Sequence, residues 1–187
     1  MIELVHPDSS SLWETARVLV REYAASLNVK LDFQNFDDEL LHFEEEYAPP
    51  GGTFLLARDL SSLRSHGDIR NHGDTRSGDI RSRDLRSRVE EKDAEYLGCG
   101  ALRRFSEREC EMKRLYVRPA GRNLGLGRQL ALALINEAKT LGYSRMLLDT
   151  LPTMRSAQSL YKSLGFVPTK PYRFNPIDGT SFLQLDL

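Results

Sequence analysis

Hydrophobic positions recur along the chain with two different periods, and these periods predict alternating strands and helices. The first apolar run, Ile2 to Val5, stops at His6-Pro7 and predicts a strand. The residues Asp8 to Ser11 offer N-caps for a helix. The apolar residues of this helix recur at helical spacing: Leu12, Ala16, Leu19 and Tyr23. The chain is therefore expected to begin with a strand and an amphipathic helix.

A second helix and three strands are predicted next. The helix would begin at Asp37, a candidate N-cap, and end before the turn Pro49 to Gly52. Its inward-facing residues would be Leu40, Leu41 and Phe43. The three strands are Thr53 to Ala57, Tyr96 to Leu102 and Glu109 to Val117. Because a polar turn, Phe105 to Arg108, joins the last two, we expect an antiparallel meander.

The third of these strands changes phase along its length. Cys110 and Met112 have one parity, whereas Leu115 and Val117 have the other, so regular alternation would turn half of them away from the core. A bulge between the two pairs would correct this and would leave backbone amides free to bind a ligand. Alternatively, both faces of the strand are buried and no bulge is required.

The second half of the chain continues the alternation of strands and helices. After Arg118-Pro119, a helix carries the apolar stripe Leu126, Leu130, Leu134, Ala138 and Leu141. The strand Met146 to Leu151 follows, which predicts a right-handed βαβ crossover with parallel strands. A helix from Pro152 bears Ala157, Leu160, Tyr161 and Leu164, and Phe166-Val167 and Thr180 to Leu187 complete the sheet. The predicted fold class is α/β with mixed strand directions.

Composition and charge narrow the functional classes. The 187 residues suit one domain, and 40% apolar with 28% charged residues are typical of a soluble globular protein. A net charge of −1 provides no electrostatic basis for binding nucleic acid or an anionic membrane. The N-terminus lacks the pattern of a secretory signal, and no apolar run is long enough to span a membrane. We therefore expect a cytoplasmic protein.

The two cysteines predict neither a disulfide framework nor a four-ligand zinc site. In a hairpin centred near Ser106 and Glu107, Cys110 would face about Arg103. This register keeps Cys110 away from Cys99, so no disulfide between them is predicted.

One segment, 59–93, differs from the rest in composition. It contains the degenerate repeats RSHGDIR, NHGDTR, SGDIR and SRDLR, with eight basic and eight acidic residues. The balanced charge disfavours an arginine-rich nucleic-acid arm, and the scarcity of apolar residues predicts a disordered insertion between two strands of a single domain spanning 1–187. His66 and His72 in the insertion are expected to be solvated, and no metal is predicted.

A glycine-containing loop offers an anion site. Arg122 to Gly127 lies between a strand and a helix, so its backbone amides would point from a positive helix end. Gly125 and Gly127 would allow a pyrophosphate to approach the main chain, and Arg122 and Arg128 would add charged contacts. The loop is neither a Walker motif nor a complete dinucleotide fingerprint, and tight packing of the helix start is the alternative explanation for its glycines.

Several motifs occur in a characteristic order. They are Arg122-x-x-Gly125-x-Gly127 after the strand Leu115-Tyr116-Val117, the strand Met146 to Asp149, and Ala157-x-x-Leu160-Tyr161-x-x-x-Gly165-Phe166. Together they resemble the GNAT superfamily of acyl-CoA-dependent N-acetyltransferases, and Cys110 to Val117 is similar to a bacterial subfamily mostly of unassigned substrate. The resemblance covers the chain apart from the insertion. It implies a single-domain mixed sheet in the order β-α-α-β-β-β-β-α-β-α-β-β with helices on both faces.

The resemblance also implies where acetyl-CoA binds. Backbone groups of Leu115, Tyr116 and Val117 would hold the pantetheine and the acetyl carbonyl. The pyrophosphate would lie on Arg122, Asn123, Leu124, Gly125, Leu126, Gly127 and Arg128. Met154 departs from the family, because many members carry asparagine at this position near the pantetheine.

Two side chains are candidates for the chemistry. An alkyl amine is mostly protonated at pH 7, and deprotonating it costs roughly 4 to 5 kcal/mol, so a base or a water chain to one is useful. Glu111 on the third strand is the candidate base, resembling a strand glutamate of some family members; it is alternatively an ordinary strand carboxylate paired with Lys113 or Arg114. Tyr161 matches the tyrosine that protonates the leaving thiolate in the family, and it is alternatively a core aromatic residue.

The predicted function is transfer of acetyl from acetyl-CoA to a primary amine, in a small molecule or a peptide, by direct attack in a ternary complex. The alternative is a non-catalytic acyl-CoA-binding sensor or interaction module. Acidic residues on the second helix would attract a cationic acceptor or form a solvated face, and Tyr172 and Asn175 are expected to border the acceptor cleft. Neither nucleic acid nor a membrane is an expected partner, and a homodimer is one option for assembly.

Overall fold

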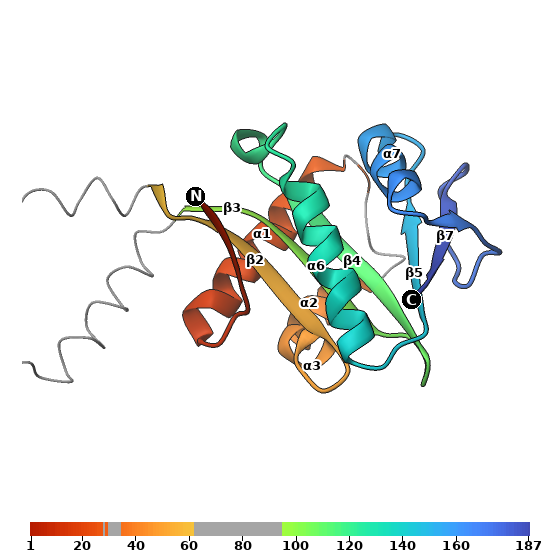
Figure 1. Ribbon diagram of the computed structural model, residues 1–187, viewed down its shortest axis with the longest axis horizontal. Helices are drawn as coiled ribbons and strands as arrows, with labels where there is room; N and C mark the ends of the chain where they lie inside the picture. The colour runs from red at the N-terminus through yellow and green to blue at the C-terminus, as the bar shows by residue number, and fades with distance from the viewer. Residues whose placement is uncertain (28, 30–34, 62–94) are drawn as a thin grey trace, which may run out of the picture.

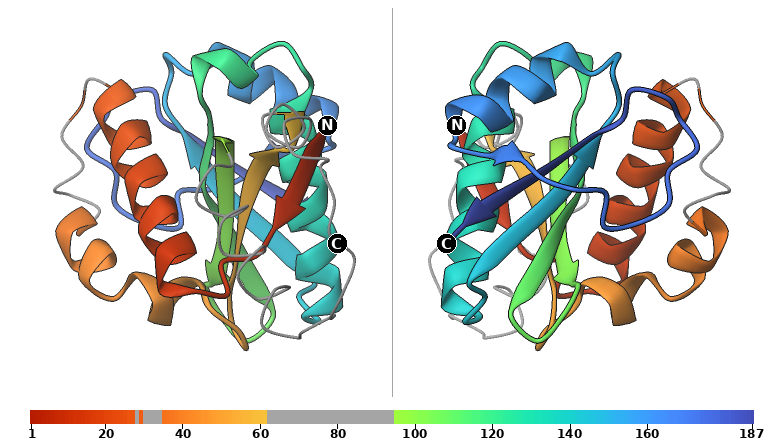
Figure 2. Two further views of the ribbon diagram at one scale, coloured as in Figure 1. Left: turned by 90° about the vertical axis from the view of Figure 1, so that its left-hand side faces the viewer. Right: turned by 90° about the vertical axis from the view of Figure 1, so that its right-hand side faces the viewer.

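The protein forms one central sheet with helices on both faces. A computed structural model describes residues 1–27, 29, 35–61 and 95–187. In this part of the chain, seven strands form a mixed sheet in the order β1-β2-β3-β4-β5-β7-β6. Helices α1 to α3 lie on one side and α6 and α7 on the other (Figures 1 and 2). The predicted α/β fold class is confirmed.

The bounds of the elements follow the predicted alternation closely. The strands are β1 (Ile2–Val5), β2 (Thr53–Asp59), β3 (Glu95–Arg104), β4 (Glu109–Val117), β5 (Arg145–Thr150), β6 (Val167–Pro168) and β7 (Ser181–Asp186). The helices are α1 (Ser10–Ser26), α2 (Phe36–Leu41), α3 (Phe43–Tyr47), the 3-10 helix η3 (Pro119–Gly121), α6 (Leu126–Thr140) and α7 (Arg155–Ser163). In the described residues, three strands lie between the first helices and α6. The predicted meander has three strands at this place, whereas the family order has four.

Strand pairing confirms both predicted units. β2, β3 and β4 pair antiparallel, and β1 adds to the free side of β2. α6 then returns the chain so that β5 pairs parallel to β4. β7 pairs antiparallel to β5 and carries the short β6 at the far edge.

The first helix begins where the sequence indicated, because the backbone amide of Leu12 donates to the hydroxyl of Ser9 over 3.3 Å. The predicted second helix, in contrast, is two short helices joined at His42. Asn35 and not Asp37 is the N-cap of α2, and Leu41 is 76% exposed although it was expected to face inward. The chain bends after α2, and Phe43 and Tyr47 of α3 supply the buried face in its place.

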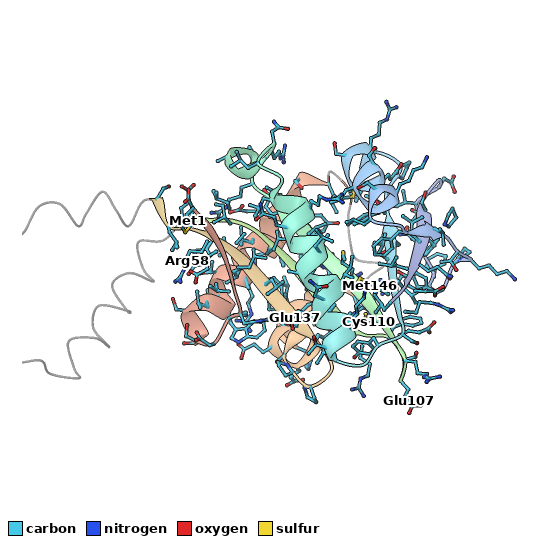
Figure 3. All side chains as sticks on the ribbon, in the orientation of Figure 1. Met1, Arg58, Glu107, Cys110, Glu137 and Met146 are labelled. Carbon is cyan, nitrogen blue, oxygen red and sulfur yellow. The ribbon has the colours of Figure 1, made fainter. Side chains whose placement is uncertain are left out.

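Two apolar clusters enclose the sheet. On one face, Leu12, Leu19 and Val20 of α1 pack with an aromatic group of Trp13, Phe43, Tyr47 and Phe54. On the other face, α6 buries Leu126, Leu130, Leu134 and Ala138 against the sheet. Cys110 and Met146, which are paired neighbours on β4 and β5, lie beside α6 (Figure 3). The predicted stripe of α6 is confirmed.

Both cysteines are buried and reduced, as expected. Cys110 pairs with Arg104 rather than Arg103, one residue from the predicted register. Over the described ranges, no helix is both long and apolar enough to cross a membrane.

The predicted insertion joins two strands that are neighbours in the sheet. Asp59 at the end of β2 pairs with Glu95 at the start of β3. All of the insertion after Ser61 lies outside the described residues, so its disorder stays a prediction from the sequence.

Deleting Ser61 to Arg88 should leave the domain folded, because seven residues remain to connect two strand ends that already pair. Shortening a flexible loop changes the closure entropy by only about 1 to 2 kcal/mol. Urea unfolding of the deletion variant and the full chain would measure the difference. A variant that fails to fold, or slow amide hydrogen exchange across Gly67 to Arg86 in the full chain, would contradict the disorder prediction.

Candidate functional site

A bulge in β4 sets the geometry of the site. Ala101 of β3 pairs with Lys113 and Cys99 pairs with Tyr116, so Arg114 and Leu115 lie opposite Gly100 alone. Arg114 has a φ of 56°, which is uncommon for a residue other than glycine. The bulge predicted from the phase change is confirmed. It shifts the parity of the strand, and Leu115 and Val117 therefore pack with the same core as Cys110 and Met112.

β4 and β5 pair only over their first residues and then separate. Their parallel ladder includes only Glu109 to Glu111 on β4 and Arg145 to Leu147 on β5. Both strands continue for several residues, β4 to Val117 and β5 to Thr150. The backbone groups of β4 that face β5 past Glu111 are therefore available to a ligand.

A cleft of about 760 Å³ opens at this separation. Its first wall is Leu115 to Val117 of β4, with Arg122 and Gly127 of the glycine loop. The opposite wall comes from the start of α7 and the loop before it: Leu151, Pro152, Thr153, Met154, Arg155, Ser156, Ala157 and Leu160. Tyr23 of α1 and Leu27, the C-cap of this helix, contribute at one end.

The cleft continues into a smaller inner cavity of about 40 Å³, with which it shares Tyr23, Leu115 and Met154. This volume has room for a water molecule or a small polar group. Besides Tyr161, the side chains that line only the inner cavity are Met112, Lys113, Arg114, Asp149 and Thr150. The hydroxyl of Thr150 is buried and has no hydrogen-bond partner among the described residues. A polar ligand in the cavity would satisfy it.

The glycine loop has the backbone geometry expected of an anion site. Gly125 adopts a φ of 72° and is the N-cap of α6; its carbonyl accepts from the amide of Arg128, and helix geometry gives the amides of Leu126 and Gly127 before it no partner within the helix. A Cβ added to Gly127 would be 3.8 Å from Leu160 and Val117, so a larger side chain there would extend into the cleft. Arg122 lines the cleft and donates to the carbonyl of Val117 over 3.3 Å.

The remaining loop residues predicted to bind the cofactor have different positions. The side chain of Leu126 is buried in the core, whereas Leu124 is exposed. Arg128 donates to the hydroxyl of Ser163 on α7 over 2.8 Å and does not line the cleft. Asn123 and Gly125 are also absent from the lining of the cleft, so a ligand would reach this part of the loop only through backbone amides at its outer end.

Tyr161 is buried on α7, 6% exposed, and its ring packs against Phe166. Burial raises the pKa of its hydroxyl, and the neighbouring charges of Tyr23 and Asp149 act in the same direction. The hydroxyl is therefore protonated at neutral pH and able to donate. Its place on the inner cavity suits a proton donor at that end of the cleft.

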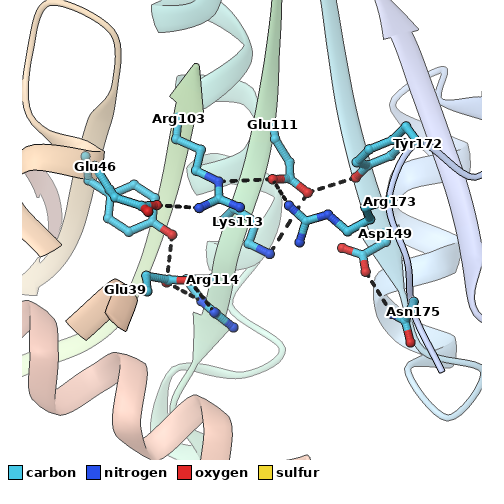
Figure 4. Close-up of polar contacts among 11 residues, drawn as sticks. Glu39, Glu46, Arg103, Glu111, Lys113, Arg114, Asp149, Tyr172, Arg173 and Asn175 are labelled. Carbon is cyan, nitrogen blue, oxygen red and sulfur yellow. Dashed lines mark hydrogen bonds and ion pairs between the residues drawn. The ribbon is translucent and has the colours of Figure 1, made fainter. Parts of the chain in front are cut away.

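Glu111 lies in a different environment from the one predicted for a base. Its side chain is completely buried and lines neither the cleft nor the inner cavity. Its carboxylate accepts hydrogen bonds from Arg103 over 3.1 Å, from Tyr172 over 3.0 Å and from Arg173 (Figure 4). An amine would reach this carboxylate only by displacing one of these donors.

Arg114 and Glu39 form a buried ion pair beside the bulge. The guanidinium donates Nε and Nη2 to the two carboxylate oxygens over 2.7 and 2.6 Å, and both side chains are 2% exposed. Tyr47 donates to the same carboxylate over 2.8 Å. Burial raises the pKa of the Glu39 carboxyl, but the hydrogen bonds and charge of Arg114, together with Lys113 and Tyr47, lower it to about 2.

A polar group of cations surrounds Glu111; the sequence analysis named Lys113 as a possible partner of this carboxylate but missed Arg103 and Arg173. Lys113, Arg103 and Arg173 converge on Glu111 from β4, β3 and the loop before β7. The sequence contains one signal for this face: Glu111 and Lys113 alternate with the core residues Cys110 and Met112, which places the two charged residues together on the opposite face of the strand. Two acidic residues of the predicted second helix are also paired: Glu46 accepts from Arg103, and Glu44 accepts from Arg17.

The predicted acceptor residues Tyr172 and Asn175 face this polar group. Asn175 donates to Asp149 over 3.0 Å, and Tyr172 donates to Glu111. Among the described residues, no three histidine, cysteine, aspartate or glutamate side chains are grouped to hold a metal ion.

Comparison with known proteins links this geometry to one family. Residues 34–166 match the family described as "Acetyltransferase (GNAT) family". An uncharacterized N-acetyltransferase of Schizosaccharomyces pombe is 39% identical over 172 residues, which are 91% of this chain and 86% of the relative. An uncharacterized N-acetyltransferase of Escherichia coli is 35% identical over 42% of this chain and 48% of its own length.

Solved structures have the same fold. An acetyltransferase of the GNAT family from Staphylococcus aureus superposes with a TM-score of 0.66 at 21% identity, covering 100% of this chain and 99% of that one. A protein of Salmonella typhimurium, solved with its cofactor acetyl-CoA, superposes with a TM-score of 0.56 at 16% identity, covering 99% and 93% of the two chains.

Replacing Glu39 by glutamine should destabilise the fold by about 3 to 5 kcal/mol, because the buried Arg114 charge would lose its counter-ion. The carboxylate contributes its full stabilisation above pH 4.5, and this contribution is lost as the pH falls toward 2. Between pH 4.5 and 2, the free energy of unfolding measured with urea should therefore decline less in the glutamine variant than in the wild type. Glu45→Gln, at an exposed position on α3, is the matched control. Equal stability of the Glu39 variant and the wild type would show that the pair does not support the bulge.

Proposed function

The chain belongs to the GNAT family of acetyltransferases, and we propose that it transfers the acetyl group of acetyl-CoA to a primary amine by direct attack in a ternary complex. The observation that carries this proposal is the cleft between β4 and β5. It joins a glycine loop at a helix N-terminus to unpaired strand backbone and then to an inner cavity with a tyrosine hydroxyl.

The residues present fit acetyl-CoA. Anionic phosphates suit the first-turn amides of α6 and the guanidinium of Arg122. The β4 backbone from Leu115 to Val117 offers an edge to which the amide groups of a pantetheine arm would bond, as a further strand would. Met154, where many family members carry asparagine, lines the cleft with an apolar side chain, so the bonds to the arm would come mainly from β4.

The acyl group and the amine would meet where the cleft opens into the inner cavity. An amide of the bulged segment near Tyr116 or Val117 would stabilise negative charge developing on the acetyl oxygen. Tyr161 would give its proton to the leaving sulfur. Glu111 would assist removal of the amine proton, and because it does not line the cavity it would do so through an intervening group.

The experiment that tests this function is a screen of primary amines, peptides and aminoglycosides with acetyl-CoA, measuring release of free thiol and the mass of the acetylated product. An enzyme should release thiol only when a suitable amine is present. Binding of acetyl-CoA with no thiol release above the hydrolysis background for any acceptor would favour the non-catalytic sensor.

Acetyl-CoA should raise the melting temperature of the wild type, and Gly127→Leu should abolish this increase. The new side chain would extend into the cleft while the α6 helix itself tolerates leucine. Gln129→Leu, at an exposed position of the same helix, is the control and should retain the increase. If isothermal calorimetry detects acetyl-CoA binding to Gly127→Leu at wild-type affinity, the assigned cleft is wrong.

Tyr161→Phe removes only a hydroxyl from the inner cavity. Turnover should fall on the order of 10- to 1000-fold, within the usual range for a general acid, whereas acetyl-CoA affinity should remain near that of the wild type. Steady-state kinetics with an amine from the screen and calorimetry with acetyl-CoA measure the two quantities. Unchanged turnover would assign Tyr161 to packing alone.

A further inference from the structure

The arrangement of charges on β4 raises the question of which group touches the acceptor amine. Glu111 cannot do so without rearrangement, because it is completely buried and three donors occupy its carboxylate. Lys113 is two residues further along the same face of β4 and lines the inner cavity. Its Nζ lies 4.0 Å from Oε1 of Glu111, so Lys113 connects the carboxylate with the cavity (Figure 4).

The position of Lys113 is unusual for a lysine. Its side chain is 4% exposed, and lysines are almost never fully buried unless their charge is compensated. Tyr161 and Thr150 line the same cavity, and the hydroxyl of Thr150 has no hydrogen-bond partner in the described part of the chain. Polar groups from three elements therefore converge on a space the size of a small amine head group.

We propose that Lys113 takes the proton of the acceptor amine, and that Glu111 is a positioning residue that holds Nζ beside the inner cavity. This assignment rests on the proposed amine acetylation. It replaces direct proton transfer to Glu111 by transfer to the group that lies between Glu111 and the cavity.

The charges around Lys113 support this role. The ionisable groups facing it come from its own strand and from α1, α2, β5, α7 and the loop before β7: Glu111, Arg114, Tyr23, Glu39, Asp149, Tyr161 and Arg173. Burial lowers the pKa of Lys113 from 10.5 to about 8; Glu111 and Asp149 oppose this shift, and Arg114 and Arg173 add to it. A lysine with an ordinary pKa would be as fully protonated as the acceptor and would be ineffective as a base.

The proton transfers balance as follows. An acceptor that arrives as an ammonium ion gives one proton to the neutral Nζ of Lys113. Its nitrogen lone pair then forms a bond to the acetyl carbon, the carbon–sulfur bond breaks, and the electron pair of that bond goes to sulfur. Tyr161 protonates the sulfur and regains a proton from the newly bonded nitrogen. Lys113 releases its proton to solvent, so one proton appears per acetyl group transferred.

The protonation of Lys113 is measured directly, without any acceptor, by NMR titration of lysine-labelled protein, with Lys113→Arg to assign the signal. We expect the Lys113 signal to titrate within about one unit of pH 8, with free CoA present or absent. A signal that stays in the charged form above pH 10 would overturn the proposal whatever acceptor the protein uses.

Kinetics test the role itself, using the amine with the highest turnover in the screen as the probe. Lys113→Met and Lys113→Gln should lower kcat/KM at pH 7 by about 100- to 10,000-fold and retain the melting-temperature increase with acetyl-CoA. The loss should shrink as rising pH deprotonates the amine in solution, a change that a merely structural defect would not produce. Lys162→Met, at an exposed position on α7, is the control.

A wild-type rate and pH profile in both Lys113 variants would overturn the assignment. If no amine is acetylated by the wild type, the proposed function has failed, and the NMR titration alone decides whether the pKa of Lys113 lies near 8 and below that of an ordinary lysine.

Discussion

The ion pair between Arg114 and Glu39 fixes the point at which β4 changes face, and the cleft depends on that point. Arg114 has a positive φ, a backbone conformation that costs free energy for a residue other than glycine. The two short bonds to Glu39 on α2 and the aromatic rings of Tyr23 and Phe36 keep its side chain in place. Since removing one partner of such a pair leaves a buried charge, the pair strongly favours the bulged conformation over a regular strand.

The bulge keeps the apolar side chains of β4 on one face and its charged side chains on the other. Below it, Cys110 and Met112 bury against α6; above it, Leu115 and Val117 continue the same apolar layer. The opposite face before and at the bulge is polar, and its charges are tolerated because they pair with groups from α2, β3 and the loop before β7. Within β4, one face therefore belongs to a packed core and the other carries charged side chains, and the gap between β4 and β5 opens next to both.

Local pattern was sufficient to predict most of the fold and the bulge, since both depend on the period and parity of apolar residues. It was insufficient for the charged layer. Nothing near Glu111 in the sequence indicates that Arg173, 62 residues away, would bond to it. Leu41 was misassigned for a similar reason, because the bend between α2 and α3 depends on how Phe43 packs with Trp13 and Phe54. Both features depend on interactions between segments that are far apart in the sequence, which local pattern does not reveal.

Glu111, Lys113 and Arg114 lie on one face of β4 only because the bulge follows Lys113. Regular alternation places Glu111 and Lys113 on one face, and the extra residue brings Arg114 to that face as well. The lysine thus lies between a carboxylate, which holds it in position, and a guanidinium, which disfavours its protonated form. Pairing of Arg114 with Glu39 moderates this repulsion, so the contact that stabilises the bulge also adjusts the proton affinity of the group nearest the inner cavity.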